Sequence, residues 1–194
     1  MHALASRAAA PTTAVVRAIR EDQLGAPTPC AEWDVRALVD HLLMWGPPLI
    51  GAAHKELVPP AVDGDGPWRD RLLAQLDELT KAWSEPAAWE GTTNLGGPTP
   101  LPAATVGGMV LSELVVHGWD LARASGQRPE WDEEVLRFVY AEVERTAEQG
   151  RAMAVYADPV AVPATAPTLD RIVGLTGRDP ASGRTGRDPA SGAT

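Results

Sequence analysis

The sequence predicts an all-α protein, because segments with the helical spacing of apolar residues cover most of its 194 residues. No segment shows the strict apolar–polar alternation of a half-buried strand. Four substantial helices separated by loops rich in proline and glycine are typical of a helical bundle. We expect a short C-terminal helix and a polar tail to follow this four-helix bundle.

The first two helices are expected in the N-terminal third of the chain. One covers residues 12–24, and Pro11 can lie in its first turn or bend it. The other begins after Asp34, whose carboxylate can accept hydrogen bonds from free N–H groups of the first turn. The glycine and two prolines at 46–48 must kink or break this helix, which we expect to continue to about residue 57.

The remaining helices follow at regular intervals. Residues 68–83 carry leucines at i, i+3, i+4 and i+7, the spacing of an amphipathic helix. A turn-rich connection spans residues 84–102 and has room for a short strand at most. Further helices are expected at 104–124, at 132–149 with acidic residues in the first turn, and at 168–175.

The chain divides into a helical bundle, residues 1–176, and a tail, residues 177–194. The tail contains a tandem duplication, because TGRDPASG at 176–183 recurs at 185–192. Such a polar segment cannot bury enough apolar area to order itself, so the second copy is expected to be flexible. Residues after about Pro180 should therefore be dispensable for folding.

The charge balance excludes several classes of partner. The chain has 26 acidic and 17 basic residues, a net charge of −9, whereas nucleic acids and anionic membranes bind basic surfaces. No apolar run approaches the roughly 20 residues of a membrane span. A single cysteine excludes an internal disulfide or a multi-cysteine metal site, and we expect a cytoplasmic protein.

Three ionisable residues lie in the apolar stripe of the helix at 104–124. At about 100° per residue, His117 falls about 40° to one side of Glu113 and Asp120 about 20° to the other. An unpaired carboxylate facing the core would be costly. Glu113 and His117 are one turn apart and can converge on one ion. A buried Glu–His hydrogen bond, or a stripe open to solvent, would also account for them.

His41 lies among apolar residues of the second helix. It can be a hydrogen-bonded core histidine, or it can join Glu113 and His117 in a His₂Glu metal site. Three protein ligands with open positions are typical of catalytic zinc sites, and nickel or iron would also suit them. Asp120 could orient His117 by accepting from its second ring nitrogen, or it could form only a local hydrogen bond or ion pair.

The other candidate side chains are weaker. His54 would lie on the far face of the second helix beside charged residues, and His2 is at the chain terminus, so both are expected to be solvated. Cys30 precedes the helix that starts at Asp34, where the helix dipole could lower the pKa of its thiol. A buried structural cysteine is the more common case.

Three sequence blocks resemble a known family. TPCAEWDVRALVDHL (28–42) and SELVVHGWDLARA (112–124) resemble the DinB-like superfamily, and within it the mycothiol-dependent maleylpyruvate isomerase-like proteins of actinobacteria. APTLDRIVGLTGRDP (166–180) is similar to the closing motif of a small single-domain subfamily described as metal-binding. The resemblance implies a bundle holding a divalent metal, typically zinc, through His41, Glu113 and His117.

The resemblance also implies a chemistry. In an enzyme of this kind, zinc would bind the thiol of mycothiol and favour its thiolate, which would attack a small electrophile. The activity would be that of an S-transferase or an isomerase. The isomerase has a further C-terminal domain that contributes to its active site, and no residue here matches that contribution, so maleylpyruvate isomerisation itself is not assigned.

Two alternatives to an enzyme remain open, and the sequence also suggests an oligomeric state. The chain can be a non-catalytic metal- or ligand-binding protein, or a bundle without a metal site that serves as a dimeric structural protein. DinB-like bundles commonly pair, and exposed aromatic residues often mark interfaces. We therefore expect a homodimer, with four tryptophans near helix or loop boundaries as interface candidates: Trp68, Trp83, Trp89 and Trp131.

Overall fold

The structure is a computed structural model of the chain and describes residues 1–30, 33–62 and 64–182. Within these residues it is mostly helical, with one short two-stranded sheet, which confirms the predicted all-α class. The elements are α1 (Leu4–Ala18), a 3₁₀ turn (Glu21–Gln23), α2 (Val35–Ala53), α3 (Trp68–Ser84), a 3₁₀ turn (Pro86–Trp89), β1 (Thr92–Asn94), β2 (Pro100–Pro102), α4 (Ala103–Ser125), α5 (Glu133–Ala152) and α6 (Thr168–Leu175).

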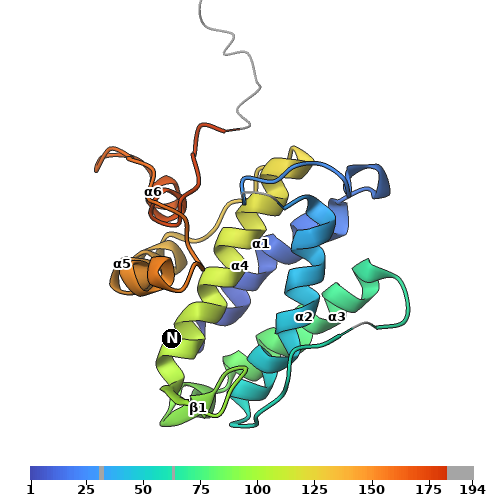
Figure 1. Cartoon of the computed structure of the whole chain (residues 1–194), viewed down its shortest axis with the longest axis vertical. Helices are drawn as coiled ribbons and strands as arrows, with labels where there is room; N and C mark the ends of the chain where they lie inside the picture. The colour runs from blue at the N-terminus through green and yellow to red at the C-terminus, as the bar shows by residue number, and fades with distance from the viewer. Residues whose placement is uncertain (31–32, 63, 183–194) are drawn as a thin grey trace, which may run out of the picture.

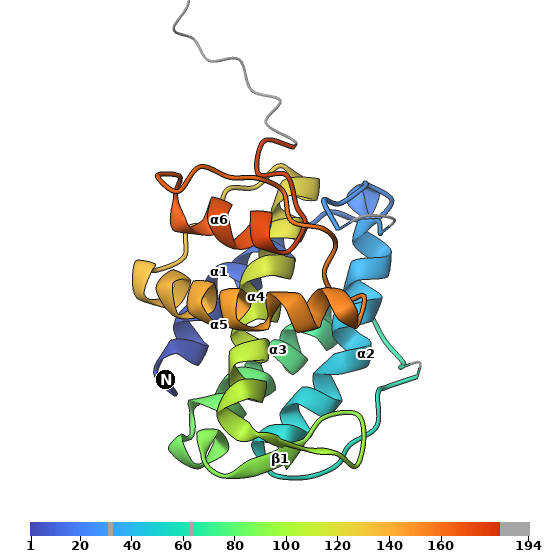
Figure 2. The same ribbon diagram turned by 60° about the vertical axis from the view of Figure 1, so that its left-hand side comes forward.

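Helices α1 to α4 form a four-helix bundle (Figure 1). In it α1 packs against α3 and α4, and α2 packs against the same two helices. Helix α5 lies across the outer side of α4, and α6 packs on α5 (Figure 2). The short antiparallel pair β1–β2 lies at the end of the bundle where α4 begins. Helix α4 is therefore covered by the bundle on one side and by α5 on the other.

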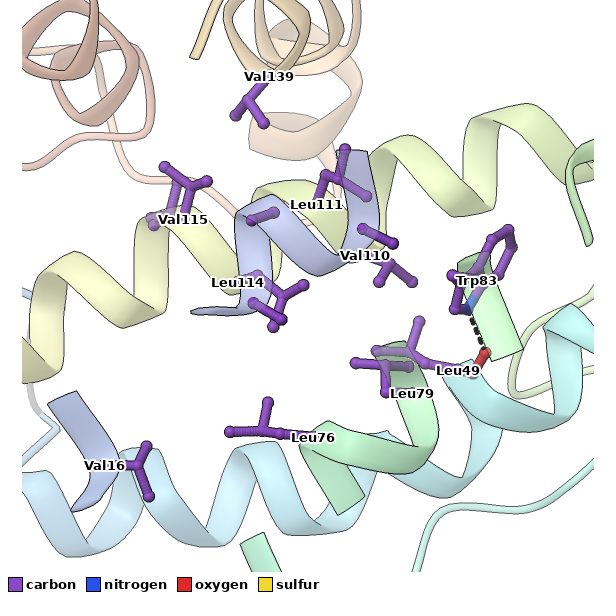
Figure 3. Packing of buried hydrophobic residues seen from close by; sticks show 14 of the residues in the cluster. Val16, Leu49, Leu76, Leu79, Trp83, Val110, Leu111, Leu114, Val115 and Val139 are labelled. Atoms are coloured by element: carbon purple, nitrogen blue, oxygen red, sulfur yellow. Dashed lines mark hydrogen bonds between the residues drawn. The ribbon is translucent and has the colours of Figure 1, made fainter. Parts of the chain in front are cut away.

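The packing around α4 explains its apolar composition. Val110 and Leu114 face α2 and α3 across the bundle interior, while Leu111 and Val115 face Val139 of α5 (Figure 3). Sixteen of the 23 residues of α4 are buried. A helix covered on two opposite sides leaves little room for a solvated polar face, so its ionisable residues need partners within the protein.

The first helix differs from the prediction at both ends. It begins at Leu4 rather than residue 12, because alanines with a weak apolar signal, including Ala5 and Ala8, are fully buried in its first turns. Pro11 lies inside the helix. The helix ends at Ala18, since Ile19 has an extended backbone and a 3₁₀ turn follows at Glu21–Gln23.

The predicted break in the second helix does not occur. Helix α2 continues through Pro47 and Pro48 and ends at Ala53, before residue 57. Each proline leaves the carbonyl four residues earlier without its helical N–H donor. For Pro48 that carbonyl belongs to Met44, and it accepts instead from the backbone N–H of Ala61 at 2.9 Å. The loop after α2 thus supplies a donor that the helix lacks.

The other predicted helices are confirmed to within three residues at each end. Asp34 caps α2 through a 2.8 Å hydrogen bond from the Ala37 N–H, and Asp132 caps α5 through a 2.8 Å bond from the Glu134 N–H. The left-handed Gly126 (φ 74°) ends α4. In the part of the chain that the structure describes, no helix is long and apolar enough to cross a membrane.

The four tryptophans proposed for a dimer interface are buried in the core, so that part of the prediction is wrong. None is more than 8% exposed. Each indole N–H already has an acceptor within the chain, which is the normal state of a buried tryptophan. The acceptors are Glu21 for Trp68, the Leu49 carbonyl for Trp83 (Figure 3), the Trp83 carbonyl for Trp89 and the Ala8 carbonyl for Trp131. The homodimer stays a prediction without this support.

The start of the predicted tail packs on the bundle. The side chain of Arg123 at the end of α4 donates to the backbone carbonyls of Pro180 (3.2 Å) and Ser182 (3.1 Å). Arg178 is only 6% exposed and forms an ion pair with the fully buried Asp120. The second TGRDPASG copy, residues 185–192, lies outside the described residues.

A chain that ends at Ser182 should fold as stably as the full chain. The removed segment is polar and has no large apolar side chain to dock, so we expect the melting temperature to change by less than ~2 °C. A chain that ends at Thr176 should melt more than about 6 °C lower, because Asp120 would lose its buried cation. Thermal denaturation followed by circular dichroism measures both, and a large drop for the chain ending at Ser182 would contradict the first expectation.

Candidate metal centre

The structure brings the three predicted ligands together between α2 and α4. The Nε2 atoms of His41 and His117 approach the same carboxylate oxygen, Oε2 of Glu113, at 3.3 and 3.4 Å. One donor atom from each residue lies within 4.8 Å of the others. The two helices pack side by side, and Glu113 and His117 are one turn apart on α4, so the cluster follows directly from the bundle.

The spacing of these donor atoms suits a divalent ion. Ligands bound to zinc at 2.0–2.2 Å in tetrahedral geometry lie about 3.3–3.6 Å from one another. Both nitrogen–oxygen distances in the cluster fall in that range. Two imidazoles and one carboxylate match zinc, and iron and nickel accept the same donors.

The orientation of His117 adds a second argument. Its Nδ1–H donates to Oδ2 of Asp120 at 3.0 Å, so in the neutral ring the Nε2 lone pair faces the carboxylate of Glu113. A lone pair and a carboxylate oxygen repel each other unless a proton or a metal ion lies between them. A proton shared with Glu113, or a metal ion bound by both groups, would satisfy this arrangement.

Asp120 is held by more than His117. Arg178, from the segment after α6, donates through Nη2 to Oδ2 of Asp120 at 2.9 Å and through Nε to Oδ1 at 3.2 Å. Burial opposes the charge on Arg178, but Asp120 outweighs it and raises the pKa of the guanidinium. Asp120 thus makes both the hydrogen bond and the ion pair that the sequence left open.

The sequence argument missed Arg178 because it lies in the segment assigned to the tail, 58 residues from its partner. Two signals could have found it. A buried Asp120 needs a nearby cation, and Arg178 belongs to the block at 166–180 that resembles a closing motif.

Trp33 covers the imidazoles from one side. Its ring centroid lies 4.7 Å from that of His41 and 6.2 Å from that of His117. Trp33 directly precedes the capping residue of α2, so the same turn that starts the helix places the indole. The contact restricts rotation of both rings, a role that the sequence did not reveal.

Glu113 is ionised in this setting. Its side chain is 29% exposed, and burial alone would raise the pKa of the carboxyl. The neighbouring His117 and His41 outweigh that effect, and the pKa is lowered. The three residues thus offer one carboxylate oxygen, a hard ligand, and two imidazole nitrogens, which are borderline ligands.

A small pocket opens beside the cluster, between α4 and the segments after α5 and α6. Both sides of the pocket combine polar and apolar side chains. Burial raises the pKa of Tyr156 in the pocket wall, so its hydroxyl stays protonated. The pocket is lined by Ser112, Glu113, Val116, His117, Val155, Tyr156 and Arg178.

A comparison with protein-family models matches the part of the chain that forms the four-helix bundle. The family model for the mycothiol maleylpyruvate isomerase N-terminal domain matches residues 5–122. The chain belongs to this family. The matched range contains His41, Glu113, His117 and Asp120, whereas Arg178 lies beyond it.

Relatives with similar sequences or structures match most of the chain. Two curated proteins from strains of Mycobacterium tuberculosis, both described as uncharacterised, are 29% identical over 177 residues, covering 85% of this chain and 90% of each relative. Crystal structures of the mycothiol-dependent maleylpyruvate isomerase and of a histidine mutant of it match with a TM-score of 0.58 and 18% identity, over 77% of this chain and 70% of theirs. At that identity the structural match shows a shared fold.

The solvent exposure of the other histidines and of the cysteine shows how each of these weaker candidate side chains is placed. His2 and His54 are exposed, as predicted. Cys30 is half-buried, and its sulfur lies within 4.8 Å of donor atoms of His117 and Asp120. Burial raises the pKa of its thiol, even though Arg178 acts in the opposite direction. A lowering by the helix dipole, the less favoured of the two interpretations, is therefore not the dominant effect.

Cys30 should react slowly with alkylating reagents. Because its raised pKa reduces the thiolate fraction and burial limits access, iodoacetamide at pH 8 should modify the folded protein several-fold more slowly than the urea-unfolded chain. Cys30 is the single cysteine of the sequence, so mass spectrometry of the intact protein follows the reaction without ambiguity. Faster alkylation of the folded protein would reveal an activated thiolate instead.

Proposed function

We propose that this protein is a metal-dependent enzyme that uses a small thiol, with His41, Glu113 and His117 as the ligands of one zinc ion. The observation that carries the proposal is the convergence of two ring nitrogens on one carboxylate oxygen at 3.3 and 3.4 Å. Membership of a family named for a mycothiol enzyme supports mycothiol as the thiol. Its place of action would be the cytoplasm, where thiols stay reduced.

The chemistry of the site follows from its residues. A divalent ion held there would favour the thiolate form of a bound thiol, whose pKa in free solution is about 8.5. Asp120 keeps the proton of His117 on Nδ1 and its Nε2 directed at the cluster. Trp33 packs against the two rings, and the buried Val116 contributes apolar surface to the pocket.

The reaction would be addition of the thiol sulfur to a small electrophile. A carbon–sulfur bond forms, and the electron pair displaced from the electrophile leaves with a leaving group in an S-transferase. In an isomerase the sulfur would add to a carbon–carbon double bond conjugated to a carbonyl group, with the electron pair passing to the carbonyl oxygen. The bond that has become single would rotate, and expulsion of the thiolate would restore the double bond. The pocket beside Glu113 and His117 is small and is lined by both polar and apolar side chains, which suits a compact substrate.

The metal assignment predicts the content of the purified protein. Wild type should contain about one zinc ion per chain after dialysis, whereas His117→Ala should retain little, because a two-ligand site binds zinc weakly. His54→Ala is the matched control, since His54 is exposed at the end of α2. Elemental analysis decides the matter, and equal metal in wild type and His117→Ala, or none in either, would contradict the site.

The thiol assignment predicts the effect of removing the third ligand. His41→Ala should abolish transfer of mycothiol to a chlorinated nitroarene while the helical circular dichroism spectrum persists, because His41 is 22% exposed and its loss leaves no large dry cavity. His54→Ala should keep its activity.

Two results would refute the thiol mechanism: unchanged turnover in folded His41→Ala, or turnover by wild type without thiol. If wild type shows no turnover with this electrophile, calorimetric titration with mycothiol, with and without a chelator, becomes the deciding measurement. Metal-dependent binding would support the thiol site. Absence of binding in a metal-loaded protein would favour the non-catalytic metal-binding alternative.

A further inference from the structure

We propose that Arg178 is a positioning residue of the metal centre: it holds Asp120, Asp120 holds His117, and the site is complete only when the segment after α6 docks on α4. This inference rests on the proposed function to the extent that it takes His117 as a ligand. Arg178 lies outside the part of the chain that the family model matches.

The hydrogen bonds around Asp120 carry the proposal. Oδ2 receives Nδ1–H of His117 at 3.0 Å and Nη2–H of Arg178 at 2.9 Å, while Oδ1 receives Nε–H of Arg178 at 3.2 Å. Because the guanidinium fork contacts both oxygens, the carboxylate cannot rotate without breaking one of these bonds. Its orientation in turn fixes the ring plane and the tautomer of His117.

The guanidinium is itself fixed by the turn that follows α6. Nη1 of Arg178 donates to the Thr176 carbonyl at 2.9 Å, and the Arg178 N–H donates to the Val173 carbonyl at 2.9 Å. Gly177 between them has a φ of 87°, a conformation that favours glycine. A Cβ at Gly177 would also meet the Cβ of Ala157 at 2.6 Å. The Thr-Gly-Arg sequence therefore forms a rigid turn that returns Arg178 to α4.

One carboxylate oxygen of Asp120 accepts hydrogen bonds from both Arg178 and His117. This shared oxygen distinguishes a residue that positions His117 from one that forms only a structural ion pair. Oδ2 of Asp120 serves both Arg178 and His117, so any movement of the carboxylate caused by loss of the arginine changes the bond to the proposed ligand. A structural pair elsewhere in the bundle would affect stability without affecting the metal.

The test measures metal affinity and ligand geometry in the full chain. Dissociation constants for Zn²⁺ and Co²⁺, and the visible absorption spectrum of the Co²⁺-loaded protein, are compared for wild type, Arg178→Gln, Asp120→Asn and the double variant. Arg171→Gln is the matched control, because Arg171 lies close by in α6 but stacks on Tyr140 of α5 at 4.1 Å. Circular dichroism checks the folding of each protein.

Arg178→Gln should bind both ions about 10- to 100-fold more weakly, the usual effect of disturbing the partner of a metal-bound histidine, and should change the Co²⁺ spectrum. Arg171→Gln should stay within about twofold of wild type. If Arg178 acts through Asp120, the double variant should bind no more than about threefold more weakly than Asp120→Asn alone, because the two effects are not additive.

Two results would overturn the role of Arg178: wild-type affinity in Arg178→Gln, or effects that multiply in the double variant. Should Arg178→Gln fail to fold, Arg178→Lys decides, since lysine keeps the charge but cannot contact both oxygens; it should bind about 3- to 10-fold more weakly, and unchanged affinity would refute the proposal. A wild type that binds neither ion would refute the metal site itself, whereas tight wild-type binding with an unaffected Arg178→Gln would refute only the positioning role.

Discussion

The burial of α4 on two opposite sides is the constraint on which the site depends. Glu113, His117 and Asp120 lie on a helix packed between the bundle and α5, so water cannot satisfy them fully. An uncompensated carboxylate in such a place costs several kcal/mol. Glu113 meets two imidazoles and Asp120 meets His117 and Arg178. The clustering of His41 and His117 around Glu113 and the docking of the C-terminal segment both meet this requirement.

Helix α2, which carries His41, is held by contacts at its first turn and beside its two prolines. Asp34 caps its first turn, and the adjacent Trp33 stacks on the two histidine rings. Further along, the loop after α2 donates to the Met44 carbonyl that Pro48 leaves free. His41 lies between the cap and the prolines, and the packing of α2 against α4 brings it to Glu113.

The sequence predicted those features that depend on local spacing. The predicted helices at 68–83, 104–124, 132–149 and 168–175 are within three residues of the observed ones, and Asp34 caps α2 as predicted. The helical wheel placed His117 and Asp120 beside Glu113. The features it missed depend on distant partners. The buried alanines of α1, the Ala61 donor to α2 and the acceptors of the four core tryptophans all come from contacts between segments. Arg178, 58 residues from Asp120, is the clearest case.

The ion pair between Asp120 and Arg178 connects the bundle to a segment beyond the range that the family model matches. The family match stops at residue 122, yet the cation that compensates Asp120 lies at position 178. In the described residues Asp120 has one partner from the bundle, His117, and its guanidinium partner, Arg178, comes from outside the four helices. In this chain the tight turn at Gly177 supplies it, so a segment that looks like the start of a polar tail belongs physically to the site.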